Sequence, residues 1–284
     1  MGDGEVKIVG LGQAGCRVAK AFGKFPQYET VGIDTSRDAD ITIKKRANHE
    51  DYEKHFPSLK RKLKFKNEQV CVVVCGLGTI SGGVLRLLEQ LQDNELSVLY
   101  VQPDLALASE TQQKQERIVR NVLQEYARSG ALHMLYLVDN VLLEEGIGEV
   151  PILGYYDILN QAVANTMHMI NVFSHTDPVI GNFVQPAEIS RIATLGILNI
   201  EEEEEKWFYD LTSPRDVIYY YGINEEALKE DGTLFRKISD YVKAQADKSV
   251  NVSYGVFKTS YEQKYCYCIK YSSMVQSYGE LLGS

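Results

Sequence analysis

The feature that most constrains the fold is a short apolar strand that runs directly into a glycine-rich turn, and it occurs twice. Segment 5–10 leads into G-L-G-Q-A-G at 10–15, and the wholly apolar segment 70–75 leads into G-L-G-T-I-S-G-G at 76–83. A strand that is apolar at every position is typical of a parallel sheet covered on both faces. Strand and helix patterns alternate as far as residue 138, so the sequence predicts a doubly wound α/β domain.

The periodicity also predicts where the other elements lie. In the first half we expect further strands at 30–34, 96–101 and 132–138, and helices at 16–22, 83–92 and 111–129, with residues 49–64 loosely helical. A second long helix fits 155–172. Beyond it we expect a short helix at 188–194, a solvated acidic loop at 201–205, strands at 217–221, 250–258 and 264–271, and a helix at 234–245. This indicates a domain at 1–150, a core connecting helix at 151–173 and a smaller α+β domain at 174–284.

The amino-acid composition limits the kinds of partner that the chain can bind. The chain has 30 Lys and Arg against 39 Asp and Glu, a net charge of −9, and broad nonspecific DNA binding needs a basic face. The basic run 60–66 is either a local patch or a solvated turn, and both interpretations stay open. Neither an 18-residue apolar run nor a signal-peptide core occurs, so we expect a cytoplasmic protein without membrane insertion. The five cysteines and five histidines lack metal-site spacing, which predicts free thiols and no metal held by the protein alone.

The first glycine turn has the pattern of a phosphate-binding loop. Glycines permit a tight turn and close approach of backbone N–H groups to phosphate, and the following helix N-terminus favours an anion. Asp34 closes the next strand about 20 residues later, which completes the dinucleotide fingerprint, with Asp34 on a ribose hydroxyl. An NAD-dependent oxidoreductase is therefore one interpretation.

The second glycine turn suggests a different ligand. Both turns follow parallel strands, so both face the crevice at the carboxyl ends of those strands. Together they could wrap a triphosphate, with the hydroxyl groups of Thr79 and Ser81 added. The alternative is a glycine turn that only packs a helix against a strand.

Four segments resemble the tubulin/FtsZ superfamily in the same order along the chain. The sequence G-Q-A-G at 12–15 matches the tubulin phosphate loop, and 76–83 resembles the signature loop G-G-G-T-G-[ST]-G with fewer glycines. Segment 138–143 is similar to I-D-N-E-A-L of tubulin, and 156–167 resembles the start of the tubulin core helix. The resemblance implies a tubulin/FtsZ-like fold that binds GTP or GDP with Mg²⁺.

The resemblance also implies which residues bind the nucleotide. Tyr156 would stack on the guanine base, Asn160 would read its edge, and Asn140 would contact guanine or its ribose. Glu110 and Lys114 are spaced like an FtsZ ribose contact, although Glu110 is equally explained as an acid favoured by the helix dipole. The remaining expected contacts belong to the two loops and Asp34: Gly12, Gln13, Ala14, Gly15, Cys16, Gly76, Gly78, Thr79, Ile80, Ser81 and Gly82.

In this superfamily the next subunit supplies an acidic loop, N-x-D-x-x-[DE], that activates the attacking water. Here Asn182 matches the asparagine, Val184 replaces the first acid, and Glu188 stands one residue late for the second. We therefore expect Glu188 to be the catalytic acid, acting in trans, with Asp177 as a weaker substitute. The alternative is an acid at the start of a helix.

By resemblance, the chain is a compact prokaryotic or bacteriophage relative of the TubZ or PhuZ kind. It implies an assembly-dependent GTPase that stacks head to tail in the cytoplasm of a bacterial host cell and positions DNA, through an adaptor, or other phage or plasmid cargo. Two alternatives stay open: the NAD-dependent oxidoreductase, and a filament protein that binds nucleotide but scarcely hydrolyses it.

Overall fold

The first half forms a parallel sheet with the predicted strand–helix alternation. This computed structural model describes residues 6–106, 108–246 and 249–277. The strands lie in the order β3-β2-β1-β4-β5-β6, and all their pairings are parallel. The strands are β1 (Val6–Leu11), β2 (Tyr28–Asp34), β3 (Ile41–Thr42), β4 (Gln69–Cys75), β5 (Glu95–Gln102) and β6 (Met134–Asp139). The doubly wound prediction is confirmed.

Helices cover both faces of this sheet. They are α1 (Gly12–Phe22), α2 (His49–Lys54), α3 (Val84–Gln90), α4 (Glu110–Arg128), α5 (Asn140–Ile147) and α6 (Tyr155–Ser174), with a 3₁₀ turn, η1 (Thr79–Gly83), before α3. Along β4, Val72 and Val74 pack on the α3 and α4 side, whereas Cys71 and Val73 pack on the α1 and α6 side. This two-sided burial explains why β4 is apolar at every position.

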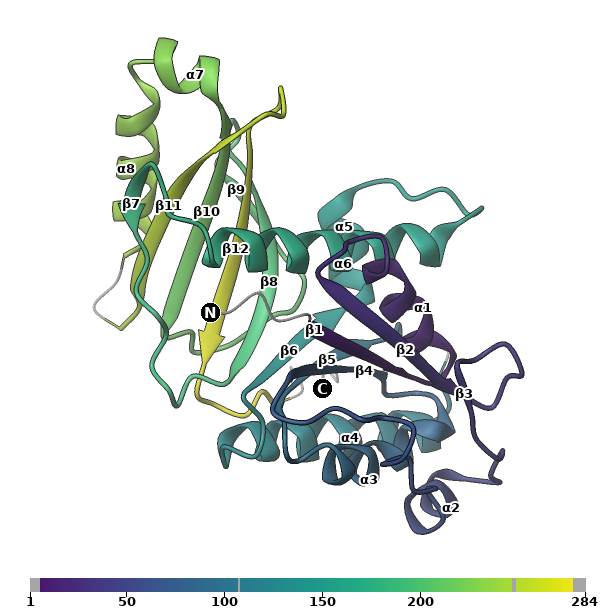
Figure 1. Cartoon of the computed structure of the whole chain (residues 1–284). Helices are drawn as coiled ribbons and strands as arrows, with labels where there is room; N and C mark the ends of the chain where they lie inside the picture. Colours follow the sequence, from purple (N-terminus) through teal and green to yellow (C-terminus); the bar gives the residue numbers. More distant parts are fainter. Residues whose placement is uncertain (1–5, 107, 247–248, 278–284) are drawn as a thin grey trace.

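Helix α6 crosses the centre of the molecule between the two halves (Figure 1). Beyond it lie β7 (Ile180–Asn182), β8 (Ile192–Asn199), β9 (Glu204–Trp207), β10 (Asp216–Asn224), α7 (Glu225–Glu230), α8 (Leu234–Gln245), β11 (Asn251–Thr259) and β12 (Tyr265–Ser272). The strand order β8-β12-β10-β11-β7 continues the first sheet, because β8 also pairs with β6 through Leu135↔Ile192 and Tyr136↔Ala193. The division into domains at 1–150, 151–173 and 174–284 stays a prediction.

Two sequence predictions in the second half are wrong. Segment 188–194 is not a helix: a turn at 188–189 leads into β8, whose buried apolar residues pair with both β6 and β12. The acidic segment 201–205 is only partly a loop, because β9 begins at Glu204 and Glu205 accepts a hydrogen bond from Tyr241 at 2.9 Å. Tyr219–Tyr221 of β10 are buried: Tyr219 and Tyr221 pack toward α8 and Tyr220 toward α6.

Candidate functional site

The two glycine turns meet at the carboxyl ends of the parallel strands. Gly12 has φ +76°, and a Cβ on it would lie 2.6 Å from Cγ2 of Ile80. The first turn therefore packs directly against the second, and a side chain at position 12 would separate them. The expected shared edge is formed, with Gln13, Ala14, Gly78 and Thr79 exposed along it.

The first turn leaves the N-terminus of α1 open. Leu11 precedes the helix without a side-chain cap, and no acidic residue lies in the first helical turn. The backbone N–H groups and the positive end of the helix dipole are thus available to an anion. Gly15 holds the helix close to β4, since a Cβ there would lie 2.5 Å from the carbonyl oxygen of Val73.

The second turn is held from behind. A Cβ on Gly76 would lie 2.0 Å from the hydroxyl oxygen of Tyr100, and one on Gly82 would lie 2.2 Å from the carbonyl oxygen of His49. Ser81 is fully buried, and its hydroxyl lies 2.7 Å from the carbonyl oxygen of Gly78 and 3.2 Å from that of Gly76. The sequence predicts that the Ser81 hydroxyl faces the shared edge, but in the structure it braces the turn instead. Thr79 is the exposed hydroxyl of this turn.

Cys16 and Asp34 lie beside the first turn. The thiol of Cys16 is 3.6 Å from the carbonyl oxygen of Ile33, and Asp34 ends β2 half-buried. Burial and, after it, the negative charge of Asp34 raise the pKa of Cys16 to about 11. Cys16 therefore stays uncharged and adds no negative charge to a phosphate site.

Cys16 should consequently alkylate slowly. At pH 8 its thiolate fraction is about a hundredfold below that of an ordinary cysteine, so we expect its rate with iodoacetamide to fall by about that factor. Mass spectrometry of the Cys16 peptide against time, with glutathione as an internal standard, measures this rate. A rate for Cys16 equal to that of glutathione would contradict the assigned environment.

A second group of polar residues follows β5 and β6. Asp139 caps α5 by accepting a hydrogen bond from the backbone N–H of Val141 at 2.8 Å, and Gln102 donates to the same carboxylate. Burial raises the pKa of Asp139. Asn140 is half-buried as the first residue of α5. Gln102 is not among the predicted site residues, because its only signal in the sequence is its position at the end of an apolar strand.

Helix α6 begins beside α5 and packs on α1. Tyr155 donates a hydrogen bond to Glu144, which with burial raises the pKa of Tyr155 to about 12. The rings of Tyr155 and Tyr156 meet edge to face at 5.2 Å between centroids, and Tyr156 is exposed. Asn160 lies one turn further along α6 and is half-buried. An exposed aromatic ring and an amide four residues apart could stack on a base and bond its edge.

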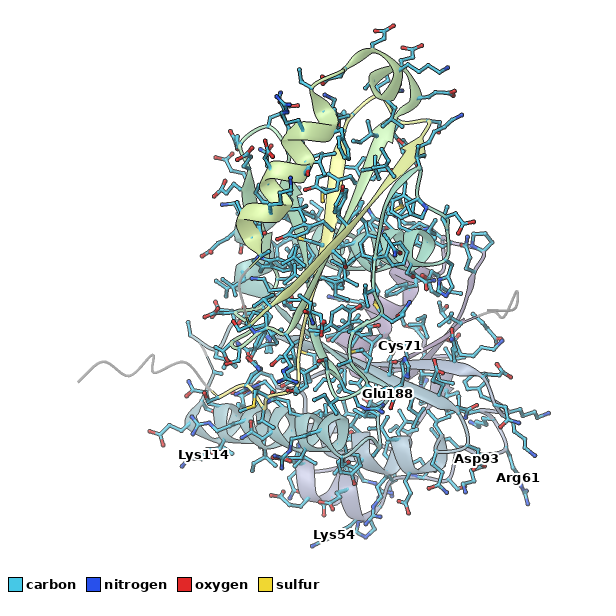
Figure 2. All side chains as sticks on the ribbon, turned by 90° about the vertical axis from the view of Figure 1, so that its left-hand side faces the viewer. Lys54, Arg61, Cys71, Asp93, Lys114 and Glu188 are labelled. Atoms are coloured by element: carbon cyan, nitrogen blue, oxygen red, sulfur yellow. The ribbon has the colours of Figure 1, made fainter. Side chains whose placement is uncertain are left out.

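Glu110 and Lys114 are exposed in the first two turns of α4. Ser109 begins this helix with a capping box to Gln112, so Glu110 is an acid in the first turn that the dipole favours. No hydrogen bond or ion pair joins Glu110 or Lys114 to the glycine turns within the part of the chain that the structure describes, and Lys114 lies well away from Glu188 (Figure 2).

Asn182 and Glu188 lie at the other end of the molecule. Asn182 ends β7, and the segment after it borders a cleft of about 480 Å³ that Ile8, Cys71 and Glu188 help to line. Figure 2 shows Glu188 close to Cys71. Ile8 and Cys71 are the third residues of β1 and β4, whereas the glycine turns follow the ends of the same strands, about 13–16 Å further along. Glu188 thus faces away from the turns of its own chain.

Within the described ranges, no group of three or more His, Cys, Asp or Glu side chains is placed so that it could hold a metal ion. None of the helices in those ranges is both long and apolar enough to span a membrane.

Comparison with solved protein structures identifies the fold that carries the two glycine turns. No family model and no curated protein sequence matches the chain. A GTPγS-form protofilament of TubZ from Bacillus thuringiensis serovar israelensis superposes with a TM-score of 0.70, at 14% identity over 95% of this chain and 86% of that one. FtsZ from M. jannaschii superposes with a TM-score of 0.68, at 14% identity over 95% of this chain and 88% of that one. This chain has the tubulin/FtsZ fold. CetZ from Methanosaeta thermophila is similar as well, with a TM-score of 0.65 at 14% identity over 94% and 86%.

Proposed function

We propose that this chain binds GTP, together with Mg²⁺, at the edge of the two glycine turns, and that it polymerises head to tail. The residues present fit the phosphate chain: an uncapped helix N-terminus, two glycine turns in contact, and the exposed hydroxyl of Thr79. The guanine would lie toward Asn140, Tyr156 and Asn160. This two-turn edge favours GTP over the dinucleotide alternative, which needs only the first turn and Asp34.

One observation carries the assembly proposal: the turns follow the carboxyl ends of β1 and β4, whereas Glu188 borders a cleft at the beginning of the same strands. A chain whose own acid faces away from its turns becomes catalytic only when another copy brings Glu188 to them. Such a heterologous contact repeats without closing and generates a filament. Solved TubZ structures of this fold are described as protofilaments and as a four-stranded filament, which supports the proposal.

In the proposed filament, Glu188 orients and polarises the water that attacks the terminal phosphate, while Asn182 helps to position it. The Mg²⁺ bound with the nucleotide would neutralise phosphate charge. With Val184 in place of the first acid of the loop, a single carboxylate performs this task, so we expect slow hydrolysis.

The test is phosphate release with GTP and Mg²⁺ over a series of protein concentrations. We expect release to rise cooperatively above a critical concentration, and Glu188→Ala to lower it by 10²–10⁴-fold, in the range for loss of a general base. Glu230→Ala, at an exposed glutamate of α7, is the matched control and should leave the rate unchanged.

Sedimentation in parallel separates the possible outcomes. Nucleotide-dependent pelleting without phosphate release would identify a filament protein that scarcely hydrolyses GTP. Monomers under all conditions, with no bound guanine nucleotide, would overturn the proposal. One solved structure of this fold is described as TubZ of type III plasmid segregation, which supports the further proposal that the filament positions DNA or other phage or plasmid cargo in a bacterial cytoplasm.

A further inference from the structure

One flank of the molecule carries a strongly basic stripe, which we define as Lys54, Lys60, Arg61, Lys62, Lys64 and Lys66. All six side chains are exposed. Residues 44–66 hold nine Lys and Arg against three Asp and Glu, whereas the whole chain holds 30 against 39. The stripe is therefore a local positive field on a protein that is otherwise acidic.

Among the described residues, no carboxylate pairs with the charges of the stripe. In the ranges that the structure describes, none of the six side chains forms an ion pair with a carboxylate within 4 Å. The three acids of residues 44–66 lie on α2 and immediately before Lys54. Figure 2 shows Lys54 and Arg61 pointing outward at the periphery, away from Glu188.

Buried side chains and hydrogen bonds hold the stripe against the first half of the chain. Leu59 and Leu63 are buried, and the backbone N–H of Leu59 donates to Oε1 of Gln90 at 2.5 Å on α3. Further along, the side chain of Asn94 donates to the carbonyl oxygen of Phe65 at 3.3 Å. Because α2 packs on η1 and the segment then follows α3 to its far end, the stripe runs lengthwise from the glycine-turn end toward the opposite end.

The spacing of the charges is regular at one end of the stripe. Lys62, Lys64 and Lys66 alternate with the buried Leu63 and the half-buried Phe65. The backbone N–H groups of Lys62 and Leu63 both donate to the carbonyl oxygen of Leu59 at 2.8 Å, so Lys62 ends a turn, and Lys64 and Lys66 follow it. The three lysines are thus exposed on a surface that the apolar side chains hold in place.

We propose that this stripe binds the phosphate backbone of double-stranded DNA. Lysine is a point-charge binder of phosphate and is depleted from protein–protein interfaces, which take their binding energy from Trp, Tyr and Arg. The exposed large apolar residues of the described chain include none between 44 and 66, so nothing in the stripe would insert into a membrane. The acidic remainder of the surface repels DNA and confines it to this flank.

The stripe belongs to each single chain, so DNA binding does not depend on assembly. If the proposed head-to-tail stacking holds, successive stripes follow one flank of the filament, and a long duplex contacts many of them at once. Such multivalent contact raises the apparent affinity without any new interaction.

The test uses the full chain without nucleotide, so that a failure of assembly does not affect it. A fluorescent 30-base-pair duplex is titrated by anisotropy at several KCl concentrations between 50 and 200 mM. The test variant is Lys62→Gln/Lys64→Gln/Lys66→Gln. The matched control, Arg236→Gln/Lys237→Gln/Lys243→Gln, removes three exposed positive charges from α8 and changes the net charge equally.

We expect the wild-type chain to bind the duplex, and the test variant to bind at least tenfold more weakly at 100 mM KCl. The slope of log affinity against log salt should fall in magnitude by about 2.7, because each of the three phosphate contacts contributes about 0.9. The control variant should stay within about twofold of the wild type. Absence of wild-type binding at 50 mM KCl, or equal loss in both variants, would overturn the proposal. The proposal would also be overturned if the wild-type chain floated with phosphatidylserine vesicles without binding the duplex, and if only the test variant lost that flotation.

Discussion

Replacing Arg120 with alanine is expected to lower the free energy of unfolding by about 3–5 kcal/mol, because it leaves the buried carboxylate of Glu116 without its counter-charge. Glu116 is 0% and Arg120 1% exposed, and their side chains meet at 3.1 Å. Tyr100 donates to the same carboxylate oxygen of Glu116 at 2.8 Å, and burial keeps the pKa of Tyr100 well above its usual value. Urea unfolding, followed by circular dichroism, measures the change.

Arg120 also connects parts of the molecule that are distant in sequence. Its guanidinium donates to the hydroxyl of Tyr209 and to the carbonyl oxygen of Gln276, both at 3.2 Å. The side chain of Gln276 in turn accepts from the backbone N–H of Thr212 at 2.6 Å. The same helix that supports the back of Gly76 through Tyr100 and Glu116 therefore anchors the segment after β12.

Two variants make this prediction specific. Glu116→Leu/Arg120→Met removes both charges and keeps the volume, so we expect it to recover most of the stability lost in Arg120→Ala. Arg128→Ala, which breaks an exposed pair with Glu125 on the same helix, should cost less than about 1 kcal/mol. If Arg120→Ala unfolds within 1 kcal/mol of the wild type, the buried pair does not hold α4 in place.

Replacing Ile152 and Leu153 together with aspartate is expected to raise the critical concentration for assembly at least a hundredfold. These two side chains are 93% and 91% exposed just before α6, at the end that carries the glycine turns. Val184 and Ile189, at 69% and 57%, are exposed beside Glu188 at the opposite end. Head-to-tail stacking would bring the two apolar surfaces together, and each apolar side chain buried there contributes about 1.5–3 kcal/mol. A hundredfold change corresponds to about 2.7 kcal/mol.

Pelleting with GTP at graded protein concentrations measures this effect. Phe235→Asp/Tyr261→Asp, at exposed aromatic residues of α8 and of the turn before β12, is the matched control and should assemble as the wild type does. Both double variants should bind one guanine nucleotide per monomer, which separates loss of assembly from loss of the site. If the Ile152/Leu153 variant pelleted as the wild type does, the subunit contact would lie elsewhere.

Much of the first half could be predicted from the sequence. The strand at 70–75, the turns after it and after β1, and the helix at 155–172 all lie within a few residues of where the pattern indicated. Predictions from periodicity were weaker after residue 174. The segment Ile192–Asn199 is apolar over a length that suits either a short helix or a strand, and only its pairing with β6 and β12 selects the strand.

The polar face of α4 shows why the candidate site was only partly predictable. Glu116, Arg120 and Gln124 recur every four residues and have the pattern of a solvent-exposed stripe, yet all three are buried. Ser81 gives a similar result, because a serine in a glycine turn can face a ligand or brace the turn, and its own hydrogen bonds decide. Sequence spacing places such residues on one side of an element without identifying what covers that side.

The sequence by itself determined the strand–turn–helix units and the two glycine turns, because these depend on local demands: a backbone with positive φ at Gly12, close helix–strand contact at Gly15, and continuous apolar runs. Only the tertiary structure decided that the turns touch, that Tyr219–Tyr221 are core, that Arg120 is buried, and that Glu188 faces away from its own turns. Each of these depends on burial between segments distant in sequence. Burial and distance are properties of the packed chain, and no local pattern encodes them.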